Sequence, residues 1–182
     1  LVQKLVRGLG SNDIDSRLRQ QDFRGDGADP LLPWLGVPIA EVEQQQAILV
    51  IGTDIRQEQP LLAHRIRKAA LADGRVAFVN PYELSLTFPA EQSVIGPCDM
   101  LPELAAIAKA LKKRGSGTIK DLISEAQPNE RHAAIAESLK GAGKNYKGLI
   151  LLGALAASHP DYTLIKALAY VIGDATKARV GF

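Results

Sequence analysis

One pattern occurs twice in this chain and constrains its fold more than any other feature. A short apolar run ends in glycine, a polar stretch follows, and a proline then precedes an apolar helical repeat. The first copy covers residues 47–70 and the second covers residues 148–173. An uninterrupted apolar run that leads through a loop into a helix is typical of a crossover in a parallel sheet.

The remaining sequence continues this alternation of strands and helices. Strands are expected at 47–52, 75–80, 82–88, 149–153 and 179–182. Helices are expected at 1–9, 39–46, 60–72, 99–114, 118–125 and 129–140, and a last one follows residue 161. Asp99, Thr118, Asn129 and the pair Ser158 and Asp161 are expected to cap helices. The prediction is a Rossmann-like α/β fold, a doubly wound, mostly parallel sheet with helices on both faces.

Length and chain ends bear on domain organisation. The chain has 182 residues, enough for one ordinary domain, and no linker divides it. We therefore expect a single α/β domain over residues 1–182. The sequence lacks an initiator methionine and begins inside a helical pattern, so we expect it to be a fragment of a longer multidomain chain.

Charge and hydropathy exclude two classes of partner. The formal net charge is only +2, and the basic residues are scattered apart from Lys112, Lys113 and Arg114. That trio ends an expected helix, where cations suit the macrodipole, so no nucleic-acid partner is expected. No apolar run approaches the roughly 20 residues that span a bilayer, so no direct membrane span is expected.

The loop after the first strand is the candidate cofactor site, because doubly wound folds bind ligands at the carboxyl ends of their strands. Gly52 would let a phosphate approach the backbone, but Asp54 and Glu58 would repel it, and Pro60 lacks an amide donor. Asn80 stands where dinucleotide sites carry an acidic residue that binds ribose. Gly52, Asp54 and Asn80 are thus the candidate cofactor-binding residues. Turn chemistry is the favoured explanation of Gly52 and Asn80, and the favoured interpretation of the loop is that no cofactor binds.

No residue is predicted to be catalytic or to bind a metal. His64 and His132 are expected on exposed helix faces, and His159 is expected to serve the start of the last helix. None of the three has a second histidine at metal-ligand spacing. The single cysteine, Cys98, can ligate no iron–sulfur cluster alone.

Four stretches resemble a known family. They are LVQKLVRGLGSNDIDSRLRQQDF at the start, GTDIRQEQPLLAHRIRKAA, LILLGALAASHPDY and the closing KARVGF. They resemble the large iron–sulfur subunit of bacterial NADH:quinone oxidoreductase, respiratory complex I. More broadly, they resemble the molybdopterin oxidoreductase superfamily.

The resemblance implies a fold of nucleotide-binding ancestry. Molybdenum enzymes of this superfamily carry a cysteine-bearing motif near the place of Arg17, Leu18 and Arg19, and Asp-Pro-Arg where this chain has Asn80, Pro81 and Tyr82. These departures argue against bound molybdopterin and agree with the complex I branch, whose corresponding domain is thought to have kept the fold and lost the cofactor.

The resemblance also implies a role and a setting. The chain would be a cofactor-less structural domain, with the iron–sulfur clusters of the parent subunit ligated outside it. Its partners would be other subunits of the peripheral arm, on the cytoplasmic side of the bacterial inner membrane. The charged segment 11–23, with Asp13, Asp15, Arg17, Arg19 and Asp22, would be either an ordered strap against neighbouring protein or a solvated loop. The alternative function is a dinucleotide-binding domain of a molybdenum-dependent oxidoreductase.

Overall fold

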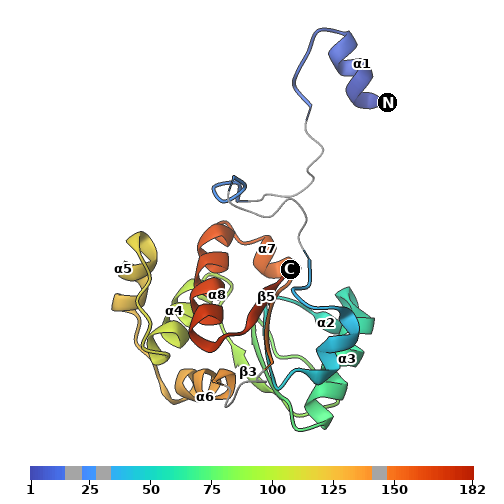
Figure 1. Cartoon of the computed structure of the whole chain (residues 1–182). Helices are drawn as coiled ribbons and strands as arrows, with labels where there is room; N and C mark the ends of the chain where they lie inside the picture. Colours follow the sequence, from blue (N-terminus) through green and yellow to red (C-terminus); the bar gives the residue numbers. More distant parts are fainter. Residues whose placement is uncertain (15–21, 28–33, 141–146) are drawn as a thin grey trace.

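A computed structural model describes residues 1–14, 22–27, 34–140 and 147–182. Five strands form one sheet in the order β3-β2-β1-β4-β5, and every neighbouring pair is parallel (Figure 1). The strands are β1 (Ala47–Ile51), β2 (Arg75–Asn80), β3 (Glu91–Val94), β4 (Gly148–Leu152) and β5 (Arg179–Gly181). The predicted α/β class with a parallel, doubly wound sheet is confirmed.

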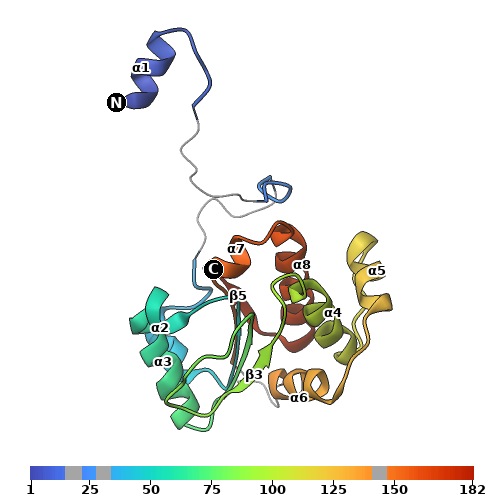
Figure 2. The same ribbon diagram turned by 180° about the vertical axis from the view of Figure 1, so that it is seen from behind.

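Helices cover both faces of the sheet (Figures 1 and 2). One face carries the 3₁₀ helix η1 (Ile39–Gln44), α2 (Ile55–Glu58) and α3 (Pro60–Leu71). The other carries α4 (Met100–Ala110), α5 (Gly117–Glu125), α6 (Glu130–Leu139), α7 (Ala154–Ala157) and α8 (Tyr162–Thr176). The first helix, α1 (Val2–Gly8), buries no residue and lies apart from the sheet. No helix in the described ranges has both the length and the apolar character needed to cross a bilayer.

The burial of β1 on both faces explains why apolar and polar residues do not alternate in its sequence. All five of its residues are buried, with Ile48 and Val50 in the core beneath α3 and Leu49 and Ile51 in the core beneath α4 and α8. Successive strand residues point to opposite faces, and both faces are covered by helices, so each position must be apolar. All five residues of β4 are buried as well, as the second copy of the sequence pattern predicts.

The prediction of a strand at 82–88 is wrong, because no strand lies between β2 and β3. Because β2 and β3 are parallel, the chain must return across the sheet before β3 begins at Glu91, and residues 81–90 make this return without a helix. Leu84 is buried on the α3 face with Leu86 and Phe88 partly buried beside it, which accounts for their alternation. The Gln92 side chain bonds the backbone N–H and C=O of Leu84 at 2.8 and 2.9 Å, in place of a strand partner.

Two predicted helix caps are wrong and one is confirmed. Thr118 lies inside α5, which begins one residue earlier and follows Ser116. Asp99 precedes α4 but makes no side-chain cap bond, and this helix ends at Ala110 rather than near Arg114. Asn129 caps α6 as predicted, since its Oδ1 accepts the backbone N–H of His132 at 3.1 Å.

Candidate functional site

The point where the strand order reverses lies between β1 and β4. The chain builds β1, β2 and β3 in one direction and then returns to place β4 and β5 on the other side of β1. The register pairs Ile51 with Leu152, so Gly52 and Gly153 follow the two strands side by side. The two copies of the sequence pattern therefore provide the two loops of this switch point, where doubly wound folds bind ligands.

The two loops at the switch point are in direct contact. A Cβ atom on Gly153 would lie 2.1 Å from Cβ of Thr53, and one on Gly52 would lie 2.5 Å from the backbone nitrogen of Ala156. Gly52 also has φ +63°, a conformation that favours glycine. Both glycines are thus required by the close approach of the loops, which leaves no space between the two backbones for a ligand.

The backbone amides of α7 have acceptors within the chain. Leu155 and Ala156 donate to the carbonyl oxygen of Gly52 at 2.9 and 3.2 Å. Ala154 donates to Oε2 of Glu58 at 3.3 Å. Amides at the start of a helix lack intrahelical acceptors, and in nucleotide sites they bind phosphate oxygens. Here the loop after β1 satisfies them instead.

The carboxylate of Glu58 lies at the position that an anionic ligand of this loop would need. Its Oε1 accepts the backbone N–H of Asp54 at 2.9 Å, and its Oε2 accepts the hydroxyl of Thr53 at 2.8 Å. With the amide of Ala154, this carboxylate joins both switch-point loops. A phosphate would have to displace it and would meet its negative charge.

The three candidate cofactor residues all lie at this edge of the sheet, and each has a local partner. Asn80 is 1% exposed, and its side chain accepts from the N–H of Thr53 and donates to the C=O of Thr53, both at 3.0 Å. Asp54 precedes α2 and accepts the N–H of Gln57 at 3.4 Å. Gly52 contacts Ala156 as described. Their role toward a cofactor stays a prediction.

A hollow of about 350 Å³ adjoins the switch point and is electronegative. It lies between α2 and the segment after β2, and its lining includes Asp54, Arg56, Tyr82 and Glu83. Burial raises the pKa of the Tyr82 phenol, and the carboxylates of Asp54 and Glu58 raise it further. The Arg56 guanidinium donates to the carbonyl of Ser85. The residues of the switch point and this hollow therefore do not fit the pyrophosphate of a dinucleotide cofactor.

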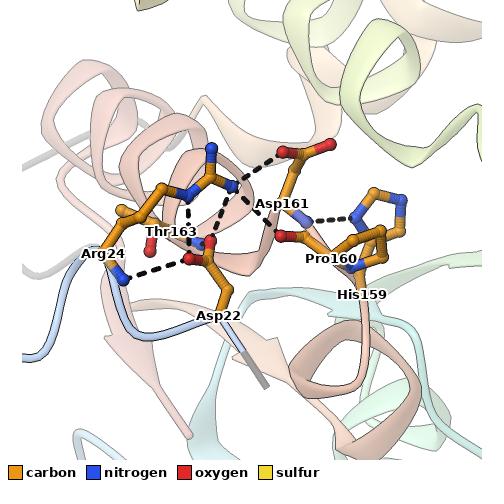
Figure 3. Close-up of polar contacts among 6 residues, drawn as sticks. All are labelled: Asp22, Arg24, His159, Pro160, Asp161 and Thr163. Carbon is orange, nitrogen blue, oxygen red and sulfur yellow. Dashed lines mark hydrogen bonds and ion pairs between the residues drawn. The ribbon is translucent and has the colours of Figure 1, made fainter. Parts of the chain in front are cut away.

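A second polar cluster joins the N-terminal segment to the start of α8 (Figure 3). The carboxylate of Asp22, whose side chain is 2% exposed, accepts the N–H of Thr163 at 2.9 Å and pairs with the guanidinium of Arg24 at 2.8 Å. Arg24 also reaches Asp161 at 2.7 Å and the carbonyl of Pro160 at 3.1 Å. The bond to Arg24, followed by backbone N–H donors, holds the pKa of Asp22 well below its usual range.

This cluster corrects the prediction for the cap of α8. Asp161 is the residue before the helix but makes no side-chain cap bond, and Ser158 donates its hydroxyl to the carbonyl of Ala154 instead. Asp22 does the capping from another part of the chain. Within the segment 11–23, Asp22 is thus ordered against this chain's own α8, whereas Asp13 is exposed beside Ser11. Asp15, Arg17 and Arg19 lie outside the described residues.

The histidines differ from one another in ways that the sequence predicts only in part. His64 is exposed, as predicted, and Nδ1 of His159 accepts the N–H of Asp161 at 3.0 Å before α8. The prediction that His132 is exposed is wrong, because this residue is only 6% exposed. Its Nδ1 accepts the N–H of Asn129 at 2.9 Å, so its ring proton lies on Nε2 and is donated to Glu103 at 2.8 Å. The capping box turns this ring inward.

The functional groups that sequence reasoning misses are long-range carboxylate contacts. In the sequence Glu58 stands out only as a charge that repels phosphate, and Asp22 only as part of a charged segment. The partner of Glu58 in α7 is 96 residues away, and the partner of Asp22 in α8 is 141 residues away. Patterns in the neighbouring sequence do not predict contacts between residues so far apart in the chain. Within the described ranges, no three His, Cys, Asp or Glu side chains are placed to hold a metal ion.

The geometry agrees with a comparison against known families. The family model of molybdopterin oxidoreductases matches residues 1–179, nearly the whole chain. This chain belongs to the molybdopterin oxidoreductase family.

Proposed function

We propose that this chain is a structural domain of the large iron–sulfur subunit of NADH:quinone oxidoreductase and has lost the cofactor site of its family. The parent subunit passes electrons from NADH towards quinone through iron–sulfur clusters bound outside these residues. The domain itself performs no chemistry. It provides a rigid α/β body in the peripheral arm of the complex, on the cytoplasmic side of the bacterial inner membrane.

The strongest support for this proposal is the set of hydrogen bonds that Glu58 accepts. The carboxylate of Glu58 accepts from Thr53, Asp54 and Ala154, so it occupies the donors of both switch-point loops. A carboxylate built into the chain supplies the negative charge that these donors attract and requires no bound ligand. A family member that still bound a dinucleotide would need those donors free.

Two further observations support it. The loops touch at Gly52 and Gly153, so opening the site would require their backbones to separate. The lining of the hollow beside them includes two carboxylates, of Asp54 and Glu83, against the single guanidinium of Arg56, so its net charge is negative. The resemblance of the opening segment to the large iron–sulfur subunit of complex I provides the specific parent.

The test is to purify the parent polypeptide from its native membrane through an affinity tag. We expect it to co-purify with NADH:quinone reductase activity and to contain iron but no stoichiometric molybdenum by elemental analysis. One molybdenum atom per polypeptide would contradict the proposal and favour the alternative, a dinucleotide-binding domain of a molybdenum-dependent oxidoreductase. Reductase activity absent from the tagged preparation but present in the untagged membrane fraction would contradict the assignment to complex I.

A further inference from the structure

Five cationic side chains surround a hollow of about 420 Å³ between the end of α4 and the outer helix α5. They are Lys109, Lys112, Lys113, Arg114 and Lys120, and we call this feature the basic hollow. It shares no residue with the switch point. In Figure 1 α5 stands at the outer side of the helical layer.

Within the described residues, no carboxylate neutralises the charges of the basic hollow. No Asp or Glu lines it, and no carboxylate in the described part of the chain forms an ion pair with any of its five cations. The ammonium of Lys109 donates to the carbonyls of Ser124 and Ala126, both at 2.7 Å, and so ties α4 to the end of α5. The other four cationic residues are exposed.

The helix macrodipole explains only part of this cluster. Lys112, Lys113 and Arg114 follow α4, whose carboxyl end favours cations. Lys120, however, lies near the start of α5, where the macrodipole disfavours a cation. Lys112 has φ +58°, a conformation in which glycine or asparagine is usual. Like charges gathered in this way repel one another, and a negatively charged partner relieves the repulsion.

We propose that the basic hollow is the docking surface for an acidic protein segment of a partner subunit. The proposal rests on the proposed role in a multisubunit complex for the origin of that partner. The exposed cations, which stand at separate positions around the hollow, suit carboxylates spread along a segment, and the buried side chain of Ile123 gives the hollow an apolar floor.

Charge elsewhere on the chain argues against a nucleic acid in this hollow. The sequence has 22 Lys and Arg against 20 Asp and Glu, so outside the five residues of the basic hollow acidic residues outnumber basic ones. A long polyanion that continued beyond the hollow would meet net negative charge. A short acidic segment needs only the hollow itself.

The test measures binding of a fluorescein-labelled, glutamate-rich peptide to the full chain by fluorescence anisotropy at low salt. The charge-reversal pair Lys113→Glu with Lys120→Glu is expected to weaken binding about tenfold, because two screened surface pairs are lost. Lys112 is left intact because of its backbone conformation. The matched control is Lys4→Glu with Arg7→Glu on α1, two exposed residues with the same change of charge, and it is expected to change binding less than about twofold.

Three results would overturn the inference. They are no peptide binding by the unaltered chain, an equal loss in both charge-reversed pairs, or tighter binding of duplex DNA or tripolyphosphate than of the peptide in the same assay. Circular dichroism of each variant confirms that its helices are intact. Binding of a cofactor at the switch point would defeat the proposed function but leaves this measurement unchanged, so the two failures are distinguishable.

Discussion

Gly153 offers the sharpest single test of the closed switch point. A methyl group there would lie 2.1 Å from Cβ of Thr53, whereas carbon atoms pack about 3.5–4.0 Å apart. Thr53 cannot retreat freely, because Asn80 bonds both its N–H and its C=O at 3.0 Å. Overpacking of this kind costs about 1–3 kcal/mol. A buried backbone group that loses its partner adds about 1–2 kcal/mol.

We therefore expect Gly153→Ala to lower the free energy of unfolding by about 3 kcal/mol, equivalent to a fall in Tm of about 9 °C for a domain of this size. Urea unfolding followed by circular dichroism measures the change, and an unaltered slope confirms that the native state is compared with the same unfolded state. Gly27→Ala is the matched control, since no atom of the residues that the structure describes lies within 4 Å of its added Cβ. A Gly153→Ala variant as stable as Gly27→Ala would refute the contact between the loops.

Three further predictions concern the polar contacts, and urea unfolding measures each. Asp22→Ala should cost about 2 kcal/mol at neutral pH, from the lost cap and the lost charge-assisted bonds. The folded state holds the pKa of Asp22 below its ordinary value of 3.8. The difference in unfolding free energy between the two proteins should therefore be full above about pH 5 and shrink as the pH falls below about 4. A pH-independent difference would contradict the assigned ion pair. Asn80→Ala should cost about 2 kcal/mol, since it leaves the N–H and C=O of Thr53 unpaired, and no loss would contradict that bonding. His132→Ala should cost about 2 kcal/mol by removing the hydrogen bond that Nε2–H donates to Oε2 of the half-buried Glu103 carboxylate, whose Oε1 still accepts from Ser93; a loss under about 0.5 kcal/mol would contradict that bond.

The strands next to the switch point could be predicted because their burial leaves a strong signal. β1 and β4 are buried on both faces, and only an uninterrupted apolar run satisfies that environment. The run at 82–88 misleads for a related reason. An extended crossover that lies on one face of the sheet alternates in the same way as a strand, and only the parallel direction of β3 distinguishes the two.

The candidate site could be located from the sequence, but its internal bonding could not. The strand-to-helix loops and the residues Gly52, Asp54 and Asn80 follow from pattern alone. That Asn80 binds the backbone of Thr53 depends on the pairing of β1 with β2. The basic hollow shows the same limit, because Lys120 joins the visible basic run only through the packing of α5 on α4.

The central claim is that the chain's own carboxylate and carbonyl groups take the amides that would bind a dinucleotide. Titration of the isotope-labelled chain with guanosine diphosphate, followed by ¹H–¹⁵N correlation spectra, tests it most directly. The account predicts that the amide resonances of Thr53, Asp54 and Ala154 stay in place up to millimolar nucleotide. Saturable shifts of these three resonances at micromolar nucleotide would contradict it.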